Sequence, residues 1–253
     1  MEASLEALRF GFAAWSGESW TLRVGGDAVP AYHARPDGMP VAGIVIATDI
    51  GGLRPLFTDM ADRLSSHGLA VMVVEPFARQ PEAQGKAPAD RFVDVGRLRD
   101  REQVGDLVAA ADALVVHDNV ARVALLGFCM GGMFALKGAA SGRFDWTVAC
   151  YGMIRLPDAW VGPGLQHALD VADSAGPTLA VFGSEDPWTP PADVDALRAC
   201  WADHRDCEVL VVEGADHGFV HDPERPTHRV ADARMVWDRI IAWGDGDVRT
   251  PAW

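Results

Sequence analysis

The stretch VALLGFCMGGMFALK, residues 123–137, carries the strongest fold signal in the sequence. An apolar run leads into the pattern glycine–x–Cys129–x–glycine, and a helical stretch follows directly. A strand-to-helix turn this sharp strains the backbone of its central residue and leaves no room for side chains two positions away, which explains Gly127 and Gly131. The turn also places the central side chain at a helix N-terminus, where the positive end of the helix dipole favours a thiolate. The stretch therefore predicts that Cys129 is a nucleophile presented on an elbow between strand and helix.

Apolar runs and amphipathic stretches alternate along most of the chain. Runs without polar alternation indicate strands that are covered on both faces, as in a parallel sheet. The apolar runs lie at 44–47, 70–74, 123–126, 147–151, 178–182 and 209–212. The amphipathic stretches lie at about 54–67, 100–118, 130–141, 191–204 and 226–243. This alternation predicts an α/β fold, a mainly parallel sheet with helices on both faces.

The remaining segments are interpreted from their turn residues and composition. Residues 18–24 and 28–34 flank a Gly-Gly-Asp turn and predict an antiparallel hairpin at the sheet edge. Residues 76–99 are rich in proline, glutamine and arginine without clear periodicity, which is typical of an irregular loop over a site. The sequence contains no repeat and no linker, so we expect a single domain over 1–253, with 1–17 as a peripheral N-terminal segment.

The composition fits a soluble enzyme and argues against several other classes. With 49% hydrophobic residues the chain is not disordered, and 22 basic against 36 acidic residues give a net charge of −14. A surface this acidic repels phosphate groups, so neither nucleic acid nor membrane lipid is an expected partner. No apolar window is long enough to span a bilayer and the N-terminus does not resemble a signal peptide, so we expect a cytoplasmic protein, a monomer or a small homo-oligomer. The four cysteines show no metal-ligand spacing; they are predicted to be free thiols, and neither metal nor cofactor is expected.

A nucleophilic thiol needs a base, and the base needs a group that orients it. Asp186 follows the run 178–182 in the segment GSEDP, and His217 follows the run 209–212 in the segment GADHGF. Nucleophile, acid and histidine in this order, each after a strand, is the arrangement of α/β-hydrolases. The sequence thus predicts a Cys129–His217–Asp186 triad, with the neighbouring Glu185 as a weaker rival for the acid.

Four more residues are predicted to surround the reacting group. The backbone N–H groups of Met130 and Ile50 are expected to form the oxyanion hole, because they follow the nucleophile and the first buried strand respectively. Trp188, two residues after Asp186, is expected to line the pocket. Phe128, beside the nucleophile, is expected to contact the substrate, although plain packing explains it equally well.

The sequence resembles the dienelactone hydrolase family over roughly residues 18–243. Four segments carry the resemblance: GFCMGG at 127–132, GSEDP at 183–187, GADHGF at 214–219 and FARQ at 77–80. The resemblance implies an α/β-hydrolase fold and a cysteine nucleophile that cleaves small lactones or enol esters, with a carboxylate on the substrate. A broader carboxylesterase or thioesterase, and a non-catalytic binding member of the fold, are the alternatives.

Three positions bear on how far the resemblance extends. Family members usually carry a glutamate, thought to control the charge of the nucleophile, where this chain has Asp49. A carboxylate beside a thiol raises the thiol's pKa, so Asp49 is expected to mute the cysteine, to order water, or only to begin a turn. Arg79 matches the family's substrate-carboxylate arginine, whose planar fork suits a carboxylate. His221 stands where the family often has a second arginine; it can donate a hydrogen bond to a substrate but lacks a permanent charge.

Overall fold

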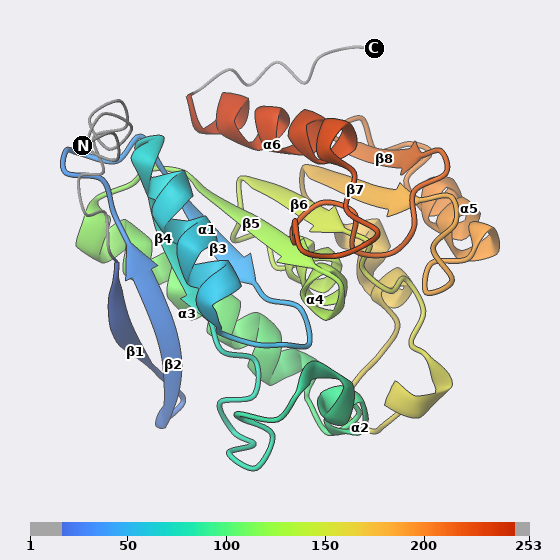
Figure 1. The fold of residues 1–253 in the computed structure, drawn as a ribbon, viewed down its shortest axis with the longest axis horizontal. Helices are drawn as coiled ribbons and strands as arrows, with labels where there is room; N and C mark the ends of the chain where they lie inside the picture. The colour runs from blue at the N-terminus through green and yellow to red at the C-terminus, as the bar shows by residue number, and fades with distance from the viewer. Residues whose placement is uncertain (1–16, 246–253) are drawn as a thin grey trace, which may run out of the picture.

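The computed structural model describes residues 17–245, and its centre is a twisted eight-stranded sheet (Figure 1). The strand order is β1-β2-β4-β3-β5-β6-β7-β8. The strands are β1 (Glu18–Val24), β2 (Asp27–Ala34), β3 (Ala42–Ala47), β4 (Leu69–Val74), β5 (Val123–Phe128), β6 (Trp146–Cys150), β7 (Thr178–Gly183) and β8 (Cys207–Val212). Strand β2 is antiparallel to both of its neighbours, and the six strands from β4 to β8 are parallel. This is the strand order and direction of an α/β-hydrolase, so the predicted fold class is confirmed.

Helices cover both faces of the sheet (Figure 1). They are α1 (Pro55–Ser66), α2 (Phe92–Val95), α3 (Asp100–Asp118), α4 (Met130–Ala139), α5 (Pro191–Cys200) and α6 (Val230–Gly244). Helices α1 and α6 pack on one face with Phe57, Leu64, Val236 and Ile240 in the buried cluster. Helices α3, α4 and α5 pack on the other face. Each face therefore buries its own apolar layer, which explains why strands β3 to β7 read as continuous apolar runs.

The element boundaries differ from the predicted ones at a few places. The predicted hairpin is confirmed, and β2 joins it to β4 at the sheet edge. The segment 76–99 is not wholly irregular, because it contains the 3-10 turn Pro88–Arg91 and the one-turn helix α2. Elements of four residues are too short to show a periodicity in sequence. Helix α6 begins at Val230 rather than at 226, since the backbone of Arg229 is extended. The N-terminal segment predicted as peripheral lies, apart from Gly17, outside the described residues.

The parallel strands bring the predicted site residues to one edge of the sheet. Thr48 and Asp49 follow β3, Cys129 follows β5, and Tyr151 follows β6. The loops after β7 and β8 carry Asp186 and His217 to the same edge. Ligand sites of open α/β sheets lie outside the carboxyl ends of the strands, so the topology alone selects this edge. Among residues 17–245, no helix is long and apolar enough to cross a bilayer.

Candidate active site

Cys129 occupies a strained turn between β5 and α4. Its backbone has φ 57° and ψ −120°, a left-handed conformation that a residue with a side chain adopts only when its surroundings enforce it. The two flanking glycines make this turn possible. A Cβ on Gly127 would lie 2.2 Å from the Gly131 carbonyl oxygen, and a Cβ on Gly131 would lie 2.1 Å from the Ala47 carbonyl oxygen. The turn geometry expected from the sequence is thus present, with a partly exposed thiol at its apex.

His217 is oriented by Asp186. Its Nδ1 lies 2.8 Å from Asp186 Oδ2, although the two residues are 31 positions apart in sequence. The other carboxylate oxygen of Asp186 accepts a hydrogen bond from the backbone N–H of Trp188. The Asp186 side chain has no exposed surface and that of His217 is 12% exposed. A carboxylate held at both oxygens fixes the imidazole with a proton on Nδ1 and leaves Nε2 for the reacting groups. The rival acid, Glu185, is exposed.

The charge of His217 is set by its two neighbours. Burial acts to lower its pKa, but the negative charge of Cys129 and hydrogen bonds with Asp186 and Cys129 outweigh burial and raise the pKa of His217 to about 10. An imidazole with this pKa is protonated at neutral pH.

Two backbone N–H groups near Cys129 are available to an oxyanion. Met130 is the first residue of α4, where an N–H has no partner within the helix. Ile50 lies in the loop after β3, and within residues 17–245 neither N–H is bonded to a protein acceptor. The Gly131 contact with Ala47 brings this loop against the elbow. The two N–H groups predicted for the oxyanion hole thus lie on segments that contact each other, the start of α4 and the loop after β3.

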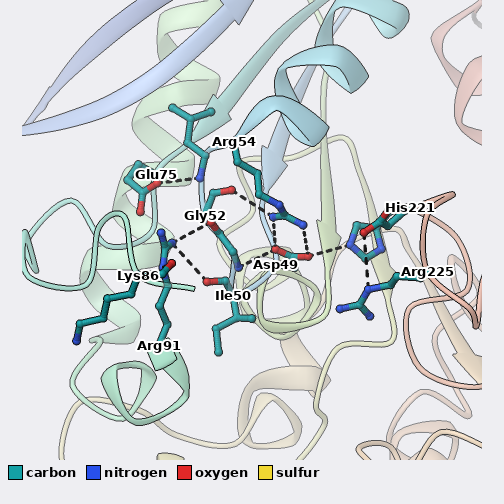
Figure 2. Close-up of polar contacts among 12 residues, drawn as sticks. Asp49, Ile50, Gly52, Arg54, Glu75, Lys86, Arg91, His221 and Arg225 are labelled. Carbon is teal, nitrogen blue, oxygen red and sulfur yellow. Dashed lines mark hydrogen bonds and ion pairs between the residues drawn. The ribbon is translucent and has the colours of Figure 1, made fainter. Parts of the chain in front are cut away.

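A second histidine, His221, is also hydrogen-bonded to an aspartate, Asp49 (Figure 2). His221 Nε2 lies 3.0 Å from Asp49 Oδ2, and its Nδ1 lies 2.5 Å from the Tyr151 hydroxyl. Arg54 binds the same carboxylate with both terminal nitrogens, at 2.5 Å and 2.9 Å. The Tyr151 ring also contacts the edge of His217, with ring centroids 5.1 Å apart. Tyr151 thus lies between the two histidines.

The second histidine has the opposite charge state from the first. Burial lowers the pKa of His221, and the nearby charges of Arg225 and Arg54 act in the same direction. Burial raises the pKa of Tyr151 well above its usual value, so its hydroxyl stays protonated and donates a hydrogen bond to His221 Nδ1. Burial also acts to raise the pKa of Asp49, but hydrogen bonds from His221 and Arg54 hold it well below its usual range. The cluster is therefore a neutral imidazole beside a carboxylate that Arg54 neutralises.

The structure corrects the predicted role of Arg79. All three guanidinium nitrogens already bind carboxylates: Nε binds Asp27 at 2.7 Å, and the terminal nitrogens bind Asp106 at 2.6 Å and 2.9 Å. Asp106 is buried on α3, and Asp27 begins β2. These contacts tie the loop after β4 to two other elements. These bonds leave one N–H on each terminal nitrogen, so Arg79 has no free pair of donors for a bidentate bond to a substrate carboxylate.

Two other predicted substrate contacts, Phe128 and His221, are wrong because their side chains are buried. For the third, Trp188, the structure shows only its position on a loop. The side chains of Phe128 and His221 have no accessible surface, and the two rings stack at 4.9 Å between centroids. Successive strand residues point to opposite faces, so Phe128 turns into the layer under α1 and α6 while Cys129 points outward. Trp188 is 42% exposed and its ring lies 5.6 Å from that of Phe92. Trp188 thus lies on the loop that carries Asp186, beside the α2 segment.

Arg54 and Tyr151 were not predicted as site residues. The apolar run 147–151 predicts that Tyr151 ends a strand, yet β6 ends at Cys150 and Tyr151 has a φ of 41°. A polar residue directly after a parallel strand was the available signal. Arg54 stands five residues after Asp49, at the start of a helix. Only the fold of the loop between them brings the two side chains together. Among the described residues, no group of three or more histidine, cysteine, aspartate or glutamate side chains is arranged to hold a metal ion.

An eight-stranded sheet with a nucleophile elbow after β5, an acid after β7 and a histidine after β8 defines an α/β-hydrolase. Comparison with known proteins narrows the class. The model of the dienelactone hydrolase family matches residues 29–244, so the chain belongs to that family of hydrolases. The carboxymethylenebutenolidase of Rhodococcus opacus is 31% identical over 228 residues, which cover 86% of this chain and 86% of that protein.

Solved structures agree with this assignment. The crystal structure of a Klebsiella pneumoniae protein described as a putative dienelactone hydrolase superposes with a TM-score of 0.81 at 26% identity, covering 90% of this chain and 98% of that chain. A dienelactone hydrolase-like promiscuous phosphotriesterase from metagenomic libraries shares the fold, with a TM-score of 0.68 at 18% identity, covering 91% of this chain and 98% of that chain.

Proposed function

We propose that this protein hydrolyses small lactones or enol esters and that Cys129 is the nucleophile. The observation that carries the proposal is the 2.8 Å contact between His217 and Asp186 next to a cysteine on a strained elbow. The raised pKa of His217, about 10, supports a protonated imidazole that can donate a proton to a leaving group. Family membership supports the reaction class, since a related protein carries the name carboxymethylenebutenolidase.

In the first half of the proposed reaction, the Cys129 thiolate attacks the carbonyl carbon. The carbonyl oxygen becomes an oxyanion, which the N–H groups of Met130 and Ile50 stabilise. The carbon–oxygen bond to the leaving group then breaks, and His217 donates its proton to the leaving oxygen. In a lactone the leaving oxygen stays attached to the acyl group, so the thioester carries a hydroxyl or enol end.

In the second half, His217 acts as a base. Acylation removes the negative charge of Cys129, which is one of the causes of the raised pKa of His217, so the imidazole becomes able to take a proton. Water gives a proton to His217 and attacks the thioester carbonyl. The carbon–sulfur bond breaks, the carboxylic acid leaves, and the thiolate is restored. A thiolate leaves more readily than an amine, so activated esters and lactones suit this site better than amides.

The test of the proposal is to replace the nucleophile and to trap the intermediate. Cys129→Ala is expected to abolish lactone turnover, and mass spectrometry of wild-type protein quenched during turnover is expected to show an acyl group on the peptide containing Cys129. Cys200→Ala is the matched control, because that thiol is also partly exposed but lies on α5. Full activity in Cys129→Ala, or after complete alkylation of Cys129, would exclude the mechanism.

A second candidate, an esterase that acts on neutral substrates, is favoured by the contacts of Arg79. The arginine expected to bind a substrate carboxylate is bound to Asp27 and Asp106, and His221 is fully buried. Pairs of lactones that differ only by a free carboxylate or its methyl ester distinguish the two candidates. Equal kcat/KM values for both members support the neutral-substrate esterase. A preference of tenfold or more for the free acid supports a carboxylate-binding site that does not use Arg79. In a non-catalytic binding member of the fold, neither substrate would turn over.

A further inference from the structure

We propose that Arg91 strengthens the oxyanion hole by orienting and polarising the backbone N–H of Ile50. The inference rests on the proposed hydrolysis at Cys129, in which this N–H stabilises the oxyanion. Arg91 lies between β4 and α3, at the end of the 3-10 turn Pro88–Arg91. It is a positioning residue, because its guanidinium contacts backbone carbonyl oxygens of the loop after β3.

The turn after β3 leaves one of its N–H groups without a partner. The N–H of Gly51 donates to Asp49 Oδ1 at 2.8 Å. The N–H of Gly52 donates to the Asp49 carbonyl oxygen at 3.0 Å. Of residues 50–52, only Ile50 has an N–H with no acceptor in the described part of the chain. The turn therefore keeps a single backbone donor free for a ligand.

Arg91 donates to the other side of the same turn (Figure 2). Its Nη1 lies 2.9 Å from the Gly51 carbonyl oxygen and 3.5 Å from that of Ile50. The Gly51 carbonyl shares its peptide group with the Gly52 N–H, which binds the Asp49 carbonyl. The Asp49 carbonyl in turn shares its peptide group with the Ile50 N–H. Because hydrogen bonds in a chain polarise one another, a positive charge at one end makes the N–H at the other end a stronger donor.

The guanidinium is buried and held by its own segment. Arg91 is 6% exposed, its Nε donates to the Lys86 carbonyl oxygen at 3.1 Å, and its central carbon lies 5.3 Å from the centroid of the Phe77 ring. Within the described residues its hydrogen bonds all go to backbone carbonyl oxygens rather than to carboxylates. Solvent screens a charge at such a place poorly, so it acts strongly on neighbouring peptide dipoles.

The buried carboxylate of Glu75 faces Arg91 across Gly52. A Cβ on Gly52, whose φ is 67°, would lie 2.6 Å from Arg91 Nη1 and 2.8 Å from Glu75 Oε2. Glu75 accepts hydrogen bonds from the backbone N–H groups of Leu53 at 2.8 Å and Phe77 at 2.9 Å. It offsets part of the charge of Arg91, but neither of these N–H groups belongs to the chain of hydrogen bonds that ends at the free donor. The two opposite charges thus hold the loop from both sides.

The test compares a ligand that forms an oxyanion with one that cannot. Phenethyl trifluoromethyl ketone is the probe: the Cys129 sulfur bonds to its carbonyl carbon, and the carbonyl electron pair moves to the oxygen. The corresponding secondary alcohol is the reference ligand, and fluorine NMR measures the Kd of each. Arg91→Met is expected to weaken the ketone about tenfold, less than the roughly 10²–10³-fold cost of a lost oxyanion donor, and to leave the alcohol within about twofold. Arg91→Lys keeps the charge and is expected to weaken the ketone less.

The matched control is Arg97→Met, since Arg97 lies in the same segment but pairs with Glu82 and Asp94. It should leave the binding of both ligands unchanged. Iodoacetamide alkylates a thiol without forming an oxyanion, so Cys129 should react at the wild-type rate in Arg91→Met. A merely structural role would weaken ketone and alcohol equally. That result, or unchanged ketone binding in Arg91→Met, overturns the proposal.

Two further outcomes keep the test decisive. If Arg91→Met does not fold, Arg91→Gln replaces it, and the same selective loss of ketone binding is expected, because the glutamine carries no charge. If the ketone forms no adduct with Cys129 in the wild type, the proposed function fails and this inference fails with it. An adduct that forms equally well in the wild type and in the Arg91 variant overturns the role of Arg91 alone.

Discussion

Two histidines four residues apart, His217 and His221, each bind an aspartate, yet their surroundings give them opposite charge states. His217 contacts Asp186 and the thiol of Cys129, and its pKa is raised to about 10. His221 contacts Asp49 and the Tyr151 hydroxyl, and burial lowers its pKa. The difference lies in the third partner. A neighbouring negative thiolate stabilises a protonated imidazole. Where an arginine already neutralises the aspartate, a positive charge on the imidazole is stabilised much less.

The comparison teaches that a histidine–carboxylate contact does not by itself define a catalytic base. The side chain of His217 is 12% exposed at the edge where substrate would bind, while that of His221 has no exposed surface and stacks on Phe128. The first pair is placed to exchange protons with a substrate. The second pair holds Tyr151 and the loop after β3 in position around it.

The largest difference between the two pairs is expected when each aspartate is replaced by asparagine. Asp186→Asn permits the wrong tautomer of His217 and is expected to lower kcat by about 10⁴-fold. Asp49→Asn leaves His217 oriented and is expected to change kcat by less than about tenfold. Steady-state kinetics of both variants on one lactone measures this. Equal losses in the two variants would mean that the pairs are not functionally distinct.

The charge states themselves can be read by nitrogen NMR of the imidazole rings. In the wild type, His217 is expected to titrate near its pKa of about 10, while His221 remains neutral at pH 7. Cys129→Ala removes the negative charge that helps to raise the pKa of His217, so its titration should move to lower pH. If Cys129→Ala left the titration of His217 unchanged, the thiol would not be a cause of the raised pKa of His217.

Tyr151→Phe tests the hydrogen bond that only the second pair makes. It leaves the buried Nδ1 of His221 without a donor, which costs about 1–3 kcal/mol of unfolding free energy. Urea denaturation measures the loss, and Tyr32→Phe is the control, because that hydroxyl donates to the partly buried Asp62. A loss no larger than that of Tyr32→Phe would show that the bond to His221 contributes little.

The smallest effect concerns acid stability. The folded-state pKa of His221 is lowered, so below pH 6.5 the unfolded chain binds a proton that the folded protein resists, and stability falls as the pH falls. His221→Gln removes this group. Between pH 7.5 and 5, wild type should lose more unfolding free energy than the variant, because only wild type carries the histidine whose folded-state pKa is lowered. Denaturation curves at the two pH values measure the difference, and equal losses would contradict a neutral, buried His221.

The architecture could be predicted because it depends on local patterns. Apolar runs at β3, β4, β5 and β7 predicted a parallel sheet, and the structure confirms the parallel pairing of these strands. The hairpin β1–β2 followed from its turn residues. Short elements such as α2 could not be predicted, since four residues do not establish a period.

The candidate site was predictable where spacing after strands is enough. The Cys129 elbow and the His217–Asp186 contact follow from residues that end successive parallel strands. The roles of Arg79 and Phe128 were predicted wrongly, because sequence does not reveal that Asp106 occupies the arginine or which face the ring takes. Asp49 and His221 are 172 residues apart, and nothing in their spacing indicates a bond.

The sequence by itself determined the parallel sheet, the strained turn that holds Cys129 and the order of the acid and the histidine, because these depend on hydrophobic period and on glycines that no other residue can replace. Only the tertiary structure decided which histidine is charged, which aspartate is paired with an arginine and which arginine is already bound to carboxylates. Those properties depend on burial and on charges that the fold brings within a few ångströms, and neither can be read along a chain.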